Sequence, residues 1–78
     1  MTLKIKYFGL IAELISKEEE FLDGSFSSVG KLEKYLLEQY PNLHHQNFKM
    51  AVNHNIVNND YKLSGNEEIA LLPPFSGG

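Results

Sequence analysis

Residues 28–41, SVGKLEKYLLEQYP, decide the fold class because they contain the clearest helix of the chain. Ser28 is a favoured N-cap residue, and Pro41 ends the pattern because proline cannot continue a helix. One such helix can cover one face of a small sheet, so strands are expected before and after it in the sequence. Its apolar stripe recurs at helical spacing, at Val29, Leu32, Leu36 and Tyr40.

The segments before this helix predict two strands and a short helical turn. In residues 2–8, apolar residues alternate with lysines, which is typical of a half-buried strand. Residues 10–15, LIAELI, have helical spacing for a turn or two. Residues 17–23, KEEEFLD, are a second strand candidate, and we interpret Glu18–Glu20 as a charged sheet edge rather than as acid/base or metal-binding groups.

The segments after the helix predict a loop at 42–47, one or two strands at 48–57, a turn at 58–60 and a final strand at 67–72. The order of strands around one good helix fits a β-grasp, a ferredoxin-like or a similar small α+β fold. The inward positions of these elements predict the core, which we expect to contain Ile5, Tyr7, Val29, Leu32, Leu36, Val52, Ile69 and Leu71.

Composition restricts the possible classes of function. The chain has 78 residues, 42% of them hydrophobic, which suits one small domain. It has no cysteine, so neither a disulfide nor a cysteine persulfide is available. The net charge is −3 and all seven basic residues are lysines, which argues against a nucleic-acid partner. The three histidines, His44, His45 and His54, lack metal-ligand spacing, so we expect no metal site.

The sequence also lacks the usual signals for membrane insertion and for catalysis. The first residues, MTLKIKYF, do not resemble a signal peptide, and no apolar run is long enough to cross a bilayer. We therefore expect a cytoplasmic protein with no membrane partner. Because the sequence has neither a phosphate-binding glycine loop nor a G-x-S-x-G motif, we expect no catalytic residue on this chain.

The stretch 71–78, LLPPFSGG, carries the feature that points to function. Prolines cannot donate to a ladder, so the sheet must end at Pro73 and Pro74, and two prolines favour a stiff, extended backbone. We therefore predict a domain at 1–74 and an extended tail at 75–78. Because glycine has no Cβ, the final Gly-Gly can enter a narrow channel in another protein and deliver a carboxylate there.

Three stretches of the chain resemble a known family over nearly its full length. They are IKYFGLIAEL at 5–14, VNHNIV at 52–57 and GNEEIALLPPFSGG at 65–78. They resemble the MoaD-like sulfur carriers, the family of the small subunit of molybdopterin synthase. The resemblance implies a ubiquitin-like β-grasp fold, with a mixed sheet of four to five strands covered by one main helix plus a short helix.

The resemblance also implies the chemistry. In that family an E1-like enzyme uses ATP to adenylate the terminal glycine, here Gly78, and sulfur then replaces the AMP to leave a thiocarboxylate. The tail enters the active site of the large subunit, in a heterotetramer whose catalytic residues are expected on the large subunit, and the sulfur passes to a cyclic pyranopterin. The carrier binds no cofactor itself. The corresponding tail of this chain is Phe75, Ser76, Gly77 and Gly78.

A partner-binding surface is expected beside that tail. By alternation, Phe8 and Leu72 fall opposite the core positions of their strands, and Ile56 lies in the strand that leads to the turn at 58–60. The family uses the corresponding surface for both its activating enzyme and the large subunit. Two departures bear on partner contacts, because relatives commonly have arginine at the position of Ala12 and valine at that of Phe75.

Three alternatives stay open. The nearest is the thiamine-pathway sulfur carrier, which shares the fold and the Gly-Gly ending, although the double proline favours the molybdopterin pathway. A second is a ubiquitin-like modifier that forms isopeptides with lysines of target proteins. A third is a binding module whose tail is inert.

Overall fold

The computed structural model describes residues 2–73, and its elements follow the order expected from the sequence. The predicted strand region 48–57 forms two strands, joined by a turn at Asn53 and His54. The elements of this part of the chain are β1 (Thr2–Tyr7), α1 (Gly9–Ile15), β2 (Glu19–Asp23), α2 (Val29–Gln39), the 3-10 helix η1 (Pro41–His45), β3 (Lys49–Val52), β4 (Asn55–Val57) and β5 (Glu68–Leu72).

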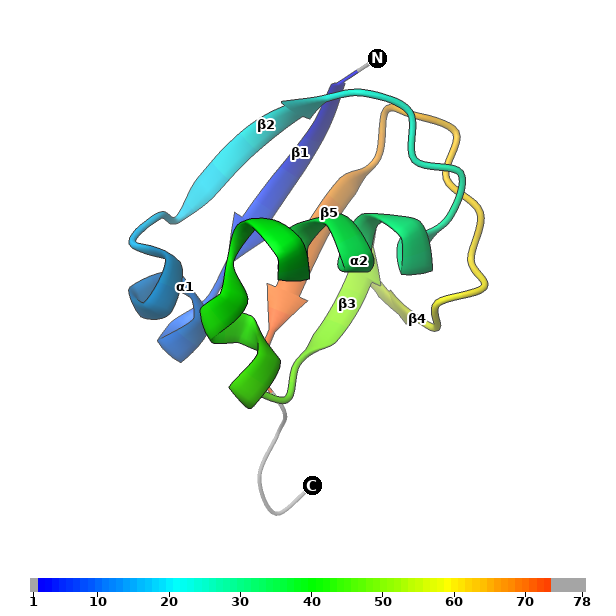
Figure 1. Cartoon of the computed structure of the whole chain (residues 1–78). Coiled ribbons are helices and arrows are strands. Elements are labelled where there is room, and N and C mark those ends of the chain that lie inside the picture. Colours follow the sequence, from blue (N-terminus) through cyan, green and yellow to red (C-terminus); the bar gives the residue numbers. More distant parts are fainter. Residues whose placement is uncertain (1, 74–78) are drawn as a thin grey trace.

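The strands form one mixed sheet in the order β2-β1-β5-β3-β4. β1 and β5 are parallel, and every other neighbouring pair is antiparallel. α2 crosses one face of this sheet, and α1 follows β1 at the end of the sheet where β5 also finishes (Figure 1). This arrangement is the ubiquitin-like β-grasp fold, so the predicted fold class is confirmed and the ferredoxin-like alternative is removed.

The core lies between the sheet and α2, and every predicted core side chain is buried there. Each of the eight residues expected in the core is at most 2% exposed. The strand residues face α2 because alternate side chains point to the same face of a sheet, and the helix residues share one stripe. The core also contains residues that were not predicted, and among them are Leu3, Ile11, Ile15, Leu43 and Met50.

The segment after α2 is not the plain loop that was predicted. Residues Pro41–His45 form a 3-10 helix, whose first residue is a proline, as suits the start of a helix. Leu43 is 1% exposed and completes the core below α2. The polar residues around Leu43 hide this pattern in the sequence, since one buried residue in six carries no periodicity.

The start of α2 contains a glycine that the helix itself does not require. Ser28 acts as the N-cap, with its side-chain oxygen 3.3 Å from the backbone nitrogen of Lys31. The Gly30 backbone N–H donates to the Asn59 carbonyl at 2.9 Å, and a Cβ at Gly30 would lie 3.2 Å from that carbonyl oxygen. Gly30 therefore allows the loop before β5 to cross the helix end and satisfy its N–H groups.

Candidate functional site

The base of the predicted tail lies at the centre of the sheet. β5 is the middle strand, and Pro73 directly follows its last residue. A Cβ at Gly9 would lie 3.3 Å from the ring carbon Cγ of Pro73, and Gly9 adopts a φ of +59°. The turn between β1 and α1 therefore packs closely against the residue where the strand ends. The predicted tail residues, Phe75, Ser76, Gly77 and Gly78, lie outside the described residues.

The face of the sheet opposite α2 carries a shallow apolar hollow next to this point. The pairing of the strands places Lys6, Ala70, Ala51 and Ile56 in one row across four strands. The two alanines leave space at the centre of the row because their side chains are short. The hollow is lined by Lys6, Phe8, Ala51, His54, Ile56, Glu68, Ala70 and Leu72.

The three residues predicted to bind partners are brought together in this hollow. Phe8 is 42% exposed and Ile56 is 55% exposed, while Leu72 is half-buried. Their neighbours in the chain, Tyr7 and Leu71, are buried on the helix side, as the alternation predicted. The structure thus joins residues from β4, β5 and the residue after β1 in one apolar surface.

Sequence reasoning missed the polar rim of the hollow. Lys6 and Glu68 form an ion pair at 3.6 Å across β1 and β5, so their charges balance on this face. His54 also lines the hollow, and it holds a positive φ of 75° in the turn between β3 and β4. The sequence NHN at 53–55 could have indicated this turn, since turns that join adjacent strands favour residues that tolerate positive φ.

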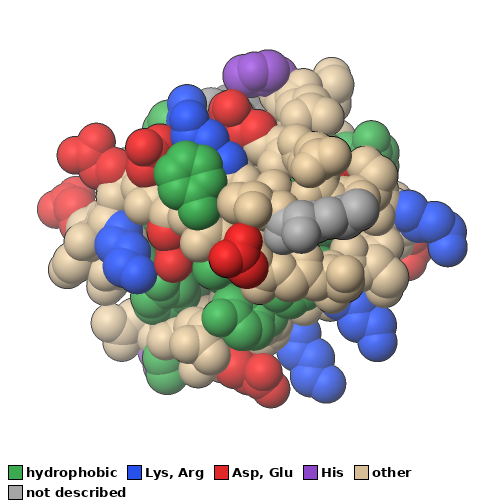
Figure 2. Space-filling model, turned by 90° about the horizontal axis from the view of Figure 1, so that it is seen from above, with side chains coloured by type: hydrophobic (Ala, Val, Ile, Leu, Met, Phe, Trp, Pro, Cys, Tyr) green, Lys and Arg blue, Asp and Glu red, His purple; other side chains and the backbone are tan. Residues whose placement is uncertain are grey.

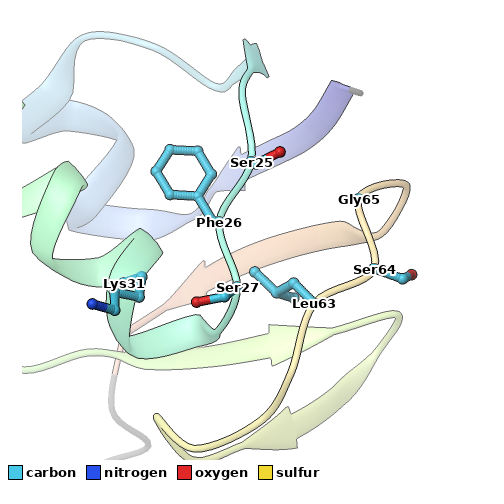
Figure 3. Close-up of a pocket in the computed structure, with 7 residues that line it drawn as sticks. All are labelled: Ser25, Phe26, Ser27, Lys31, Leu63, Ser64 and Gly65. Atoms are coloured by element: carbon cyan, nitrogen blue, oxygen red, sulfur yellow. The ribbon is translucent and has the colours of Figure 1, made fainter.

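A second hollow lies beside the first turn of α2. It is formed by the chain before α2, the first turn of α2 and the turn before β5 (Figure 3). Lys31 is its one charged residue, and the nearby helix N–H groups are already bonded within the chain. This hollow contains none of the predicted site residues, so we do not take it as the candidate site. Its lining residues are Ser25, Phe26, Ser27, Lys31, Leu63, Ser64 and Gly65.

The three consecutive glutamates around the start of β2 divide into two groups. Glu18 and Glu19 are exposed, and β2 lies at the edge of the sheet as predicted. Glu20 instead faces inward, where its carboxylate accepts hydrogen bonds from the hydroxyls of Tyr7 and Tyr40 and from the Lys17 amine. Partial burial raises the pKa of Glu20, but these three hydrogen bonds outweigh burial and hold that pKa below its ordinary value.

Metal and membrane signals are weak in the part of the chain that the structure describes. Within residues 2–73, no group of three or more histidine or carboxylate side chains could hold a metal ion. No helix in the same range is long and apolar enough to span a bilayer.

Lysines and carboxylates are interspersed over the end of the molecule near the N-terminus (Figure 2).

Comparison of the chain with protein families and curated proteins gives consistent matches over its length. The sequence pattern of the ThiS family matches residues 5–78. A molybdopterin synthase sulfur carrier subunit from Caenorhabditis elegans is 31% identical, over 100% of this chain and 99% of that protein. One from Dictyostelium discoideum is 34% identical, over 96% of this chain and 94% of that protein.

Solved structures share the same fold. A putative molybdopterin converting factor subunit 1 from Pyrococcus furiosus has a TM-score of 0.87 at 20% identity, covering 96% of this chain and 99% of that chain. The small archaeal modifier protein 1 from Methanosarcina acetivorans has a TM-score of 0.81 at 24% identity, covering 99% and 96%. A protein–protein complex of subunits 1 and 2 of the molybdopterin-converting factor from Helicobacter pylori has a TM-score of 0.70 at 25% identity, covering 100% of both chains.

Proposed function

The chain belongs to the ThiS family, and on that premise we propose how it works as a sulfur carrier subunit of molybdopterin synthase. The carboxylate of Gly78 is adenylated by an E1-like enzyme with ATP, and pyrophosphate leaves. A sulfur nucleophile then attacks the activated carbonyl and AMP leaves, so that Gly78 ends in a thiocarboxylate. The large subunit accepts the tail, and the sulfur passes to a cyclic pyranopterin.

The observation that carries this proposal is the full-length similarity to curated sulfur carrier subunits. The chemistry of the chain supports it independently. A sulfur carrier without cysteine cannot hold a persulfide, so the sulfur has to be held elsewhere. A carboxylate is a poor electrophile and needs activation, and the sequence offers no nucleotide-binding loop of its own. We therefore assign ATP and the catalytic residues to the partner proteins.

The apolar hollow on the open sheet face is the proposed docking surface for the large subunit and for the activating enzyme. Exposed apolar side chains that gather in one place are typical of interaction sites. Phe8 and Ile56 are such side chains, and Leu72 joins them one residue before the base of the tail. A partner that covers this hollow would also receive the chain that leaves β5. The related Helicobacter pylori structure is a complex of subunits 1 and 2, which supports a large-subunit partner.

The remaining organisation follows from this proposal. Residues 1–74 form the docking domain, and residues 75–78 form the tail that the partner binds. Two carriers and two large subunits form a heterotetramer, with one tail in each active site. Because activation consumes ATP, we assign the protein to the cytoplasm.

A ubiquitin-like modifier is the second candidate, since the chain shares its fold with a small archaeal modifier protein. A modifier and a carrier share the adenylation step and differ in what attacks the activated glycine. A lysine amine gives an isopeptide on a target protein, whereas sulfur gives a free carrier with a thiocarboxylate. Mass spectrometry of a cell extract separates the two, because only a modifier appears attached to other proteins.

Sulfur transfer in a reconstituted synthase tests the main proposal. The chain is prepared with a thiocarboxylate at Gly78 and mixed with the large subunit and the cyclic pyranopterin precursor. We expect one sulfur to be lost from each carrier as the dithiolene product forms. The matched control is the same chain with an ordinary carboxylate, which should give no product. Substitution of the thiamine-pathway acceptor for the large subunit tests the nearest alternative, and transfer only to that acceptor would contradict the molybdopterin assignment.

A further inference from the structure

The outer edge of β2 is a second exposed surface that sulfur transfer does not use. Within residues 2–73, β2 pairs with β1 on one side only, and its other side is the margin of the sheet (Figure 1). The backbone N–H of Tyr7 donates to the Glu18 carbonyl at 2.9 Å, which fixes the phase of the ladder. In an antiparallel ladder, hydrogen-bonded residue pairs alternate with pairs that are not hydrogen-bonded. Because Glu18 is hydrogen-bonded to β1, the backbone N–H and C=O groups of Glu19, Phe21 and Asp23 point away from β1. An added strand could form about two hydrogen bonds with each of these three residues.

The side chains of the same three residues form a distinct pattern. Glu19, Phe21 and Asp23 all lie on the open face, and they read acid, aromatic, acid along the edge. Phe21 is 63% exposed, which is the highest value among the large apolar side chains in the described part of the chain. Charged side chains such as Glu19 and Asp23 protect an edge strand from aggregation. The exposed phenylalanine between them does not serve that protection, and it offers an apolar contact in the middle of the edge.

A second copy of this chain is a poor occupant of the edge. Antiparallel pairing of two β2 strands about Phe21 would place Glu19 of each copy opposite Asp23 of the other. Like charges directly opposite each other on one face destabilise a strand pair. The partial compensation present in the monomer, a 3.6 Å ion pair from Lys4 to Glu19 and a hydrogen bond from Thr2 to Asp23, does not change the sign of this repulsion.

We propose that the outer edge of β2 is a strand-addition site for an extended segment of a partner protein with the order basic, any, apolar, any, basic. Backbone hydrogen bonds to the edge supply a general affinity, and alternate side chains supply the specificity. The two basic side chains pair with Glu19 and Asp23, while the apolar side chain covers Phe21. This site is independent of the proposed sulfur chemistry.

The position of the edge allows both surfaces to be used at once. β2 is separated from β5 by β1, and the apolar hollow extends from β1 toward β4 on the other side. Neighbouring strands are about 4.8 Å apart, so the outer edge of β2 lies roughly 10 Å or more from the base of the tail. A partner could hold the carrier by β2 while another protein receives the tail.

A peptide titration on the full chain tests this site. The probe is the capped peptide TKTVTKT, and the reading is the backbone amide NMR spectrum of the protein. We expect saturable shifts and slowed hydrogen exchange at Glu19, Phe21 and Asp23, and weaker binding at higher salt. Two control peptides are TETVTET, which reverses the charges, and TKTVTKT with an N-methylated valine, which removes the central backbone donor. Each should bind at least about tenfold more weakly.

Three protein variants complete the test. Phe21→Thr keeps a good strand former and should weaken binding of TKTVTKT at least fivefold. The double change Glu19→Lys with Asp23→Lys should reverse the preference toward TETVTET. Tyr61→Thr, at an aromatic residue that is 43% exposed and lies outside both β2 and the hollow, is the matched control and should bind as the parent does. If the double variant loses its dispersed spectrum, Phe21→Thr alone decides the matter.

Several results would overturn the proposal. They are shifts confined to the hollow around Phe8 and Ile56, equal binding of the three peptides, or full binding by Phe21→Thr. An absence of saturable binding would also overturn it. A concentration-dependent dimer that protects the same three amides without peptide would assign the edge to a second copy instead.

Discussion

The hydroxyl of Tyr40 donates a 2.6 Å hydrogen bond to the carboxylate of Glu20, which joins the C-cap of α2 to the edge strand β2. The Lys17 amine lies 3.0 Å from the same hydroxyl and 3.3 Å from the carboxylate. The Tyr7 hydroxyl completes the group from β1. One carboxylate thus connects the main helix with the edge strand β2 and with its neighbour β1.

Removal of the Tyr40 hydroxyl tests what this connection contributes. Hydrogen bonds to a charged acceptor stabilise a fold by about 1.5–3 kcal/mol, and Glu20 keeps two other donors in this variant. We expect Tyr40→Phe to lower the free energy of unfolding by about 1–2 kcal/mol at neutral pH, as measured by urea denaturation. The control Tyr61→Phe removes a hydroxyl from an exposed ring and should change this energy by less than about 0.5 kcal/mol. Equal effects of the two changes would show that the connection is unimportant.

Glu67 predicts a loss of stability in acid. Glu67 is 9% exposed, and its carboxylate accepts hydrogen bonds from the backbone N–H groups of Ser64 and Gly65 and from the Ser64 hydroxyl, at 2.6, 2.8 and 2.9 Å. Burial opposes ionisation, but these bonds lower the pKa of Glu67 to about 2. In the unfolded chain, the pKa of this glutamate is about 4. Between these two pKa values, the unfolded state binds more protons than the folded state.

The contribution of Glu67 is therefore complete above about pH 5 and is lost as the pH falls toward 2. We expect the parent to lose on the order of 2–3 kcal/mol from this group across that window. Glu67→Gln should be less stable than the parent at pH 7, and its unfolding energy should vary less between pH 5 and 2. Chemical denaturation at several pH values measures both. A variant with the parent's full pH dependence would contradict the assignment.

The packing of the core gives a third prediction. Leu32 of α2 and Leu71 of β5 are fully buried in the core between α2 and the sheet. Truncation of a buried leucine to alanine costs about 2–5 kcal/mol, which is a large part of the stability of so small a domain. We expect Leu32→Ala and Leu71→Ala to melt far below the parent. Leu10→Ala, at a residue 50% exposed, is the matched control and should melt close to it.

The proposed docking surface can be tested without loss of the fold. Phe8 is 42% exposed and lies in the hollow with Leu72, so aspartate at either position stays accessible to water in the free protein. We expect Phe8→Asp and Leu72→Asp to weaken binding to the large subunit at least tenfold, because a partner would have to desolvate the new charge. Lys62→Asp, on an exposed residue away from the hollow, is the charge control. Unchanged affinity for the large subunit in both variants would remove the hollow from the account.

Most of the fold could be predicted from the sequence because its main signals are local. Alternation marks β1 and β5, and the stripe between Ser28 and Pro41 marks α2. That Phe8, Ile56 and Leu72 lie on one surface was also predictable in part, since alternation places Phe8 and Leu72 on the open face.

The features that were missed depend on contacts between distant residues. Gly30 looks unfavourable in a first helical turn, and its reason is the loop near Asn59 that crosses it. Glu20 looks like one of three equivalent acids, and only the approach of Tyr40 distinguishes it. Leu43 has no periodic neighbours, so nothing local shows that it is buried. Such pairings arise only when the chain folds back on itself.

The intact mass of the chain after activation tests the central claim most directly. The protein is incubated with its activating enzyme, ATP and a sulfur donor, alongside a variant with one alanine added after Gly78. We expect the parent to gain the mass difference between one sulfur and one oxygen. The extended variant should melt like the parent and gain nothing, because its reacting carbonyl is displaced by about 3.5 Å and a misplacement of 1 Å can cost a hundredfold in rate. Sulfur at the new terminus at the parent's rate, or no gain in the parent, would contradict the account.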